Sequence, residues 1–306
     1  MSLGLSPRSV ASVPQHELLE ALRTTGLYLR TAPFVVHVRS AIPIVAEGLS
    51  RLYARHVCWT EPRQFADFHV TVRRQWRPGR ALCVFELDGL RPFTPLAYGE
   101  AYAFFEWGLN WCITSHCHHW ITLHAAVLER DGQAVVMPAP PGSGKSTLCA
   151  ALMMAGWRLM SDEMALLDPS SGLLTASPRP ISLKNTSISV MRSRAPDAVF
   201  GPMAHDTLKG TVCHMQVSPE STEQADVPAR PAWVVFPRYV ADAPLTVTPH
   251  PKAQALLNLH RNSFNHHVHG RQGFEALADV VAQCDVFDLR YSQLDDAVAW
   301  FERLEG

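Results

Sequence analysis

Nine residues near the middle of the chain combine glycine, lysine and hydroxyl side chains at a spacing suited to holding phosphate. They read Ala139-Pro140-Pro141-Gly142-Ser143-Gly144-Lys145-Ser146-Thr147 and match GxxxxGK[ST], except that alanine stands at the first glycine. Glycines let successive backbone N–H groups turn toward phosphate oxygens, and a following helix presents its positive end to the same anion. The stretch therefore predicts a phosphate-binding loop of the Walker A type, with Mg-ATP as the expected ligand.

The residues of this loop have separate expected roles. Lys145 is expected to reach the β- and γ-phosphates, and the Ser146 hydroxyl to bind Mg²⁺. An alternative interpretation is an ordinary glycine turn that caps a structural helix. The predicted cofactor-binding set is Pro141, Gly142, Ser143, Gly144, Lys145, Ser146 and Thr147.

Two neighbouring acids, Asp162 and Glu163, follow an apolar segment that is expected to be a strand, Trp157 to Met160. Phosphoryl transfer needs groups that hold the metal and orient or deprotonate the acceptor. The carboxyl ends of strands are where α/β sheets place ligand chemistry, so these acids are the best candidates. The alternative is a solvated loop pair or a helix cap.

Three stretches together resemble a known enzyme family. They read His124-Ala125-Ala126, then Gly142 to Thr147, then Gly156-Trp157-Arg158-Leu159-Met160-Ser161-Asp162-Glu163. This series resembles the catalytic domain of HPr kinase/phosphorylase over roughly residues 120 to 215. Nearly the whole chain is similar to the narrower HprK-related kinase A family, through Phe105-Glu106-Trp107-Gly108-Leu109-Asn110-Trp111, Ile181-Ser182-Leu183-Lys184-Asn185, Asp206-Thr207-Leu208-Lys209-Gly210 and Ser263-Phe264-Asn265.

The resemblance implies a role for each site residue. Asp162 would accept the proton of the acceptor hydroxyl, and His124 would lie near the γ-phosphate. Ser146, Glu163 and Asp162 would form the Mg²⁺ ligand set. HPr kinases carry Glu-x-Arg-Gly where this chain reads Ser182-Leu183-Lys184-Asn185, which loses a carboxylate and keeps a cation. Lys184 and Lys209 are therefore candidates to stabilise charge on the transferring phosphoryl group, with surface lysines as the alternative.

The elements around the loop follow the order that the motif requires. Apolar runs at Ile121 to Glu129 and Ala134 to Met137 flank the turn Arg130-Asp131-Gly132 and predict a hairpin that leads into the loop. Ser146 to Ala155 predicts a helix that ends at Gly156, a residue favoured at helix C-termini. Further expected strands are Phe34 to Val38, Phe68 to Val72, Leu82 to Leu87, Ile181 to Met191, Val212 to Val217, Trp233 to Phe236 and Val286 to Leu289, with helices at Tyr98 to His119, Gly273 to Gln283 and Leu294 to Leu304 and a mobile surface loop at Pro219 to Pro231.

These elements predict an α/β fold in two parts. We expect a P-loop kinase domain of the HPr kinase/phosphorylase C-terminal type at residues 119–306, behind a small N-terminal α/β region with a connecting helix at 1–118. The 306 residues carry 27 Lys plus Arg and 28 Asp plus Glu, so a net charge of -1 gives no global field to attract nucleic acid or an anionic membrane. Scattered cysteines without CxxC and the lack of a long apolar run predict a cytoplasmic protein.

Several functions fit this pattern. The favoured one is transfer of the γ-phosphate to a hydroxyl, that of serine, in a peptide or protein acceptor. A small-molecule kinase on the same fold is the second, and an ATP-gated binding module or weak ATPase in a peptide-modification system is the third. HPr kinases are hexamers, so the resemblance also implies a homo-oligomer. The histidine clusters at 116–119 and 266–269 lack the spacing of a closed zinc site and are expected to be structural.

Overall fold

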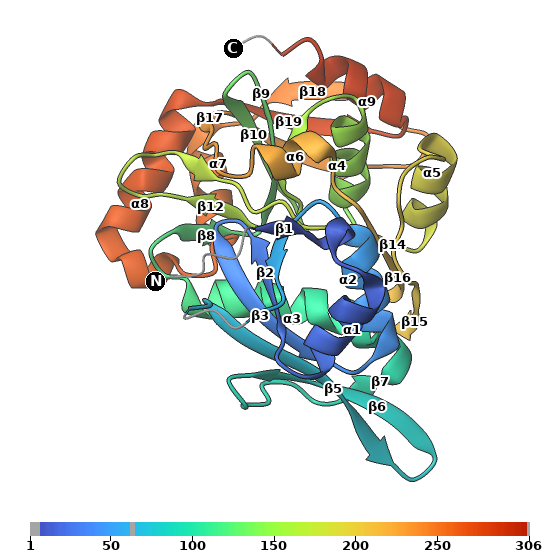
Figure 1. Cartoon of the computed structure of the whole chain (residues 1–306). Helices are drawn as coiled ribbons and strands as arrows, with labels where there is room; N and C mark the ends of the chain where they lie inside the picture. The colour runs from blue at the N-terminus through green and yellow to red at the C-terminus, as the bar shows by residue number, and fades with distance from the viewer. Residues whose placement is uncertain (1–6, 62–64, 305–306) are drawn as a thin grey trace. The chain divides into compact units, whose positions relative to one another are not determined.

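The computed structural model describes residues 7–61 and 65–304 and shows a mixed α/β protein with several sheets (Figure 1). The chain divides into two compact units. Unit 1 comprises the described residues of Met1–Cys112 with Ser182–Arg192 and Pro196–Gln216, and unit 2 comprises those of Ile113–Ile181, Ser193–Ala195 and Val217–Gly306. Within the described ranges, no helix is both long and apolar enough to cross a membrane.

A six-stranded mixed sheet forms the centre of unit 2. The strand order is β11-β9-β10-β17-β19-β18, in which β9 is antiparallel to both β10 and β11, and β10, β17 and β19 are parallel. A smaller sheet has the order β13-β12-β8. The strands are β8 Ile121–Leu123, β9 Ala125–Arg130, β10 Gln133–Pro138, β11 Arg158–Ser161, β12 Ala165–Leu167, β13 Leu174–Thr175, β17 Arg230–Tyr239, β18 Thr246–Pro249 and β19 Asp285–Tyr291.

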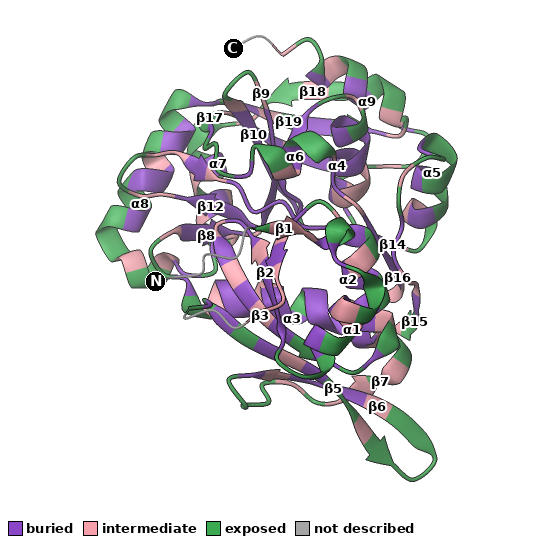
Figure 2. Ribbon diagram, viewed as in Figure 1, coloured by how far each residue is buried: buried purple, intermediate pink, exposed green. Residues whose placement is uncertain are grey.

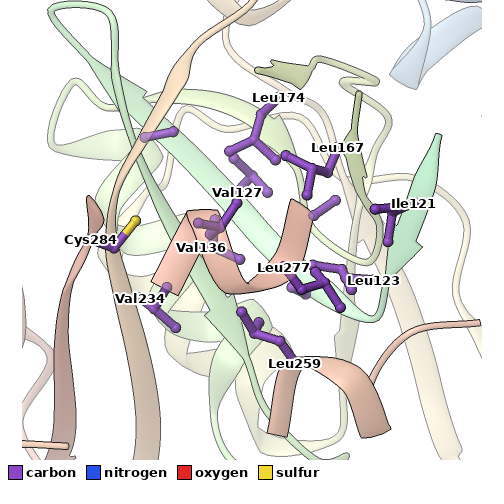
Figure 3. Packing of buried hydrophobic residues seen from close by; sticks show 14 of the residues in the cluster. Ile121, Leu123, Val127, Val136, Leu167, Leu174, Val234, Leu259, Leu277 and Cys284 are labelled. Atoms are coloured by element: carbon purple, nitrogen blue, oxygen red, sulfur yellow. The ribbon is translucent and has the colours of Figure 1, made fainter. Parts of the chain in front are cut away.

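Alternate residues of a strand point to opposite sides of a sheet, and in this sheet both sides carry buried apolar residues. Helices therefore cover both faces. On one face Val136 and Val234 join a buried cluster with Leu259 and Leu277 from two helices (Figure 3). On the other face the rings of Trp157, Trp233 and Phe301 meet edge to face. The helices are α4 Lys145–Met154, α6 Pro219–Glu223, α7 Lys252–Arg261, α8 His266–Gln283 and α9 Leu294–Phe301.

Unit 1 is built on a seven-stranded sheet with the order β1-β4-β2-β3-β5-β6-β7 and on a three-stranded sheet with the order β14-β16-β15. Its helices pack closely through glycines: a Cβ at Gly48 would lie 2.0 Å from the Tyr102 ring. The elements are β1 Arg8–Ser9, α1 Gln15–Arg23, β2 Leu27–Thr31, β3 Phe34–Ser40, α2 Pro43–Leu52, β4 Val57–Trp59, β5 Phe68–Arg77, β6 Arg80–Leu87, β7 Leu96–Ala97, α3 Ala101–His116, β14 Ile181–Lys184, α5 Thr186–Arg194, β15 Ala204–Thr207 and β16 Gly210–Met215.

The units differ from the expected division after residue 118. The boundary falls inside α3, and residues 182–192 and 196–216 group with the N-terminal part of the chain. Contacts within unit 1 explain this grouping: the Gln216 side chain donates to the Arg51 carbonyl at 2.7 Å, and a Cβ at Gly201 would lie 2.5 Å from Leu52. Packing of distant segments, which the sequence pattern does not display, therefore decides the boundary.

Two expected elements are wrong. The β-branched run Ile181 to Met191 is a short strand, β14, followed by helix α5, because Asn185 takes a left-handed φ of 53° and the Ser187 hydroxyl bonds the Lys184 N–H and carbonyl. The expected mobile loop at 219–231 contains α6 instead. Its Ser221 is fully buried and accepts a hydrogen bond from the Leu159 N–H at 2.9 Å.

Candidate nucleotide-binding site

The strand directions bring the predicted site residues of unit 2 to one edge of its sheet. Strands β10 and β11 both end at this edge, and β9 begins there because it runs antiparallel between them. The phosphate loop follows β10, the acidic pair follows β11, and His124 directly precedes β9. Three segments that are separated in the sequence thus converge because of one strand arrangement.

The loop takes the strand–loop–helix form that phosphate binding requires. Gly142 and Gly144 have φ angles of 85° and 86°, a left-handed conformation that glycine adopts without strain. Helix α4 begins at Lys145, so its first-turn N–H groups have no partner within the helix. The Ser143 N–H donates to the Pro140 carbonyl at 3.3 Å, a long hydrogen bond. Pro141 and Gly142 are exposed, whereas Ser143 is buried.

Strands β17 and β19 support this loop from the side opposite the acidic pair. The Tyr239 N–H donates to the Ser143 carbonyl at 2.8 Å, and the Tyr291 hydroxyl donates to the Gly144 carbonyl at 3.2 Å. The same Gly144 carbonyl accepts the Leu148 N–H of α4 at 3.0 Å. Backbone atoms of the loop are therefore fastened to the ends of two neighbouring strands.

Lys145 and Asp162 meet at this edge of the sheet. The Lys145 ammonium donates to the Asp162 backbone carbonyl at 3.2 Å, and both residues are buried, with 7% and 4% of their surfaces exposed. The Cys149 thiol lies nearby on α4. Burial raises its pKa well above the ordinary value, and the charge of the Asp162 carboxylate, which is hydrogen-bonded to the thiol, raises it further. The Asp162 side chain thus lies against the start of α4 (Figure 2 shows the burial of this helix).

The oxygen atoms at this edge suit magnesium. Glu163 is half-buried beside the more deeply buried Asp162, and Ser146 is half-buried in the first turn of α4. Mg²⁺ is bound in proteins by one or two carboxylates together with hydroxyl, water and substrate phosphate oxygens. Across residues 7–61 and 65–304, no group of three or more His, Cys, Asp or Glu side chains could hold a metal by itself. The residues therefore fit a metal that is shared with a bound phosphate.

His124 lies in the short break between β8 and β9. Its N–H donates to the Asn262 carbonyl at 2.8 Å, and its ring lies 6.0 Å from the Phe264 ring. The neighbouring Asn265 is only 1% exposed, and its side chain accepts from the Thr122 N–H at 2.9 Å and donates to the Trp120 carbonyl at 2.7 Å. The segment Ser263-Phe264-Asn265 is thus held against β8 by hydrogen bonds to Thr122.

Lys184 and Lys209 belong to unit 1, where their two motifs meet. Lys184 ends β14, and Lys209 lies in the exposed turn between β15 and β16. The Asn185 side chain joins them, because it donates to the Lys209 carbonyl at 3.2 Å and accepts from the Thr211 N–H at 3.0 Å. A Cβ at Gly210 would lie 2.2 Å from the Asn185 oxygen, so this position requires glycine. A role for either lysine in phosphoryl transfer stays a prediction.

Sequence reasoning missed the two tyrosines that hold the loop. It ended the strands at Phe236 and Leu289, where Pro237 and the charged Arg290 interrupt the apolar runs. In the structure the parallel pairing continues to Tyr239 opposite Tyr291. The available signal was an aromatic residue within three positions of the expected end of each buried strand.

Comparisons with known proteins give two similarities. The family model of ScmC, a SynChlorMet cassette protein, matches residues 110–194, which include His124, the phosphate loop, the acidic pair and Lys184. Among solved structures, the chain is similar to the HPr(Ser) kinase/phosphatase from Coxiella burnetii, with 15% identity over 60% of this chain and 95% of that chain and a TM-score of 0.26. No curated protein is significantly similar to this chain.

Proposed function

We propose that this protein is an ATP-dependent phosphotransferase that transfers the γ-phosphate to a hydroxyl group, that of serine in a peptide or protein acceptor. The observation that supports the proposal best is the placement of Lys145. Its ammonium lies at the start of a helix that follows a glycine-rich loop, and it bonds the backbone of Asp162, the first of two acids at the end of β11. The groups proposed to bind phosphate and metal therefore lie at one sheet edge.

The division of labour follows from these positions. The loop amides and Lys145 would bind the phosphates, and Ser146, Glu163 and Asp162 would hold the magnesium ion. Bound Mg²⁺ neutralises the charge that develops on the β- and γ-phosphate oxygens. Asp162 would also accept the proton of the acceptor hydroxyl, and His124 would contact the γ-phosphate from the start of β9.

The serine kinase assignment goes beyond the geometry of the loop. It rests on the motif series that resembles HPr kinases. The chain departs from that series at Ser182 to Asn185, where HPr kinases carry Glu-x-Arg-Gly. The ScmC match is to a cassette protein, which fits an acceptor made alongside the enzyme. ATP, magnesium and a peptide or protein partner are therefore parts of one proposal.

The test is incubation of the purified full chain with γ-labelled ATP, Mg²⁺ and a lysate of its source cells. Lys145→Ala is expected to abolish labelling, and Asp162→Asn to reduce it about 100-fold or more, because removing a general base typically costs 10²–10⁴-fold. Glu163→Gln should raise the Mg²⁺ concentration that gives half-maximal rate. Matched controls in the same unit are Lys252→Ala and Asp279→Asn, whose side chains are exposed.

Each outcome has a defined meaning. A labelled peptide or protein that depends on Lys145 and Asp162, but not on Lys252 or Asp279, supports the kinase and identifies its acceptor. A labelled small molecule would identify a small-molecule kinase. ATP binding without transferred label would assign the chain to the ATP-gated modules. Full turnover by Asp162→Asn, with thermal unfolding unchanged, would contradict the proposed base.

A further inference from the structure

We propose that the Tyr239 side chain is a stacking platform for the base of the nucleotide whose phosphates the loop binds. This inference rests on the proposed nucleotide binding and deepens it. Tyr239 is the last residue of β17, the parallel strand next to β10, so it lies at the sheet edge from which the phosphate loop starts. None of the motifs singled out in the sequence includes this residue.

The Tyr239 side chain is directly beside the loop. The backbone N–H of Tyr239 donates to the Ser143 carbonyl at 2.8 Å. A Cβ built on Gly144 would lie 2.8 Å from the Tyr239 Cβ. The acidic pair lies on the other side of the loop, beyond β9. A nucleotide whose γ-phosphate points toward those acids therefore has its nucleoside end free to lie on the Tyr239 side.

The ring of Tyr239 is exposed where a structural tyrosine would be buried. The residue is 49% exposed, whereas Tyr291, its partner across the parallel strands, is 1% exposed. Tyr291 has the structural role: its hydroxyl bonds the Gly144 carbonyl, and burial raises its pKa above the ordinary tyrosine value. Tyr239 hydrogen-bonds the loop through its backbone N–H, so this contact does not depend on the tyrosine ring.

The Tyr291 ring also packs against the Tyr239 ring. The two rings meet edge to face, with centroids 5.9 Å apart and planes at 73°. This is a preferred aromatic arrangement, in which the Tyr291 ring can cover at most one of the two faces of the Tyr239 ring. An aromatic face is a sequence-tolerant platform, because every base has a π-face to stack on it. The expected ligands therefore include ATP and GTP alike.

The experiment separates base binding from phosphate binding. Binding of Mg-ATP and of inorganic tripolyphosphate with Mg²⁺ is measured by calorimetry on the full chain, for wild type and for Tyr239→Ala, Tyr239→Phe and Tyr239→Trp. The alanine variant keeps the N–H to Ser143 and loses only the ring. We expect its affinity for ATP to fall about tenfold, its affinity for tripolyphosphate to stay unchanged, and Phe and Trp to restore ATP binding.

The control is Phe274→Ala, which removes an aromatic ring of similar exposure, 47%, from α8. It is expected to change neither affinity. Equal losses for ATP and tripolyphosphate in Tyr239→Ala would show that the ring only supports the loop, and unchanged ATP affinity would show that the base lies elsewhere. Either result overturns the platform while leaving nucleotide binding in place. If wild type bound neither ligand, the proposed function itself would fall with it.

Discussion

Gly144 has less free space than the other loop glycine, Gly142, because two tyrosine side chains lie next to it. A Cβ at this position would lie 2.7 Å from the Tyr291 hydroxyl and 2.8 Å from the Tyr239 Cβ, and the backbone has a φ of 86°. We predict that Gly144→Ala abolishes ATP binding and lowers the free energy of unfolding by more than the roughly 1–2 kcal/mol that a left-handed alanine costs. Urea unfolding and calorimetry give the two measurements.

Gly172→Ala is the matched control for that variant. Gly172 has a φ of 70° in the same unit, but nothing lies within 4 Å of its would-be Cβ. Its substitution should cost the backbone strain alone and leave ATP binding intact. If Gly144→Ala bound ATP normally and were no less stable than Gly172→Ala, the tight fit around the loop would be wrong.

The location of individual site residues could be predicted from the sequence where they belong to a motif with a known chemical role. The sequence predicted that Lys145 and Asp162 share a site, and the hydrogen bond between them fits that prediction. It did not show Tyr239, Tyr291 or Cys149, because their contribution depends on which strands lie side by side. Strand order arises from packing between distant segments, and no local spacing encodes it.

At the level of elements, Arg158 of the edge strand β11 connects this strand both to β9 and to the segment that follows α6. Arg158 and Glu129 form a buried ion pair with side chains only 2% and 9% exposed, and Arg158 also donates to the Gln224 and Val227 carbonyls at 2.8 and 3.0 Å. We predict that Arg158→Met lowers the free energy of unfolding by about 3–5 kcal/mol, because it leaves Glu129 buried without its partner.

The comparison for this prediction is Arg271→Met. Arg271 pairs with Glu275, but the two side chains are 90% and 55% exposed, and water screens such a pair. Its removal should cost less than about 1 kcal/mol in the same urea titration. Equal losses for the two methionine variants would show that burial of the Arg158 pair contributes nothing.

Elements with a strong apolar pattern were predicted well, and those that depend on polar contacts were not. Helix α4 and the turn of the β9–β10 hairpin lie where Gly156 and the apolar runs predict them, but the expected strand Ile121 to Glu129 breaks at His124 into β8 and β9, which belong to different sheets. Helix α5 was predicted as a strand, because its β-branched residues favour strands. The Ser187 side chain and the turn at Asn185 override that preference. A left-handed turn and one serine side-chain contact at the start of α5 therefore outweigh the strand propensity of the run.

At the level of the whole molecule, the cysteines form no accessible reactive group. All seven cysteines are buried. Burial raises the pKa of Cys58 to about 11 and of Cys83 to about 12, so little thiolate exists near neutral pH. We predict that maleimide labels none of the cysteines of the native protein at neutral pH and labels all of them in urea. Mass spectrometry counts the labels, and rapid labelling of a native thiol would contradict this burial.

Each unit is built from separate stretches of the chain, and this limits how the chain can be shortened. The phosphate loop lies in unit 2, but the segments 182–192 and 196–216, which the chain passes through on its way to β17, belong to unit 1. A gene fragment that began at residue 119 would still encode them, without the Tyr102 ring that meets His214 edge to face or the Arg51 carbonyl that binds Gln216. No single cut therefore separates unit 2 from the segments of unit 1 that the chain passes through between β13 and β17.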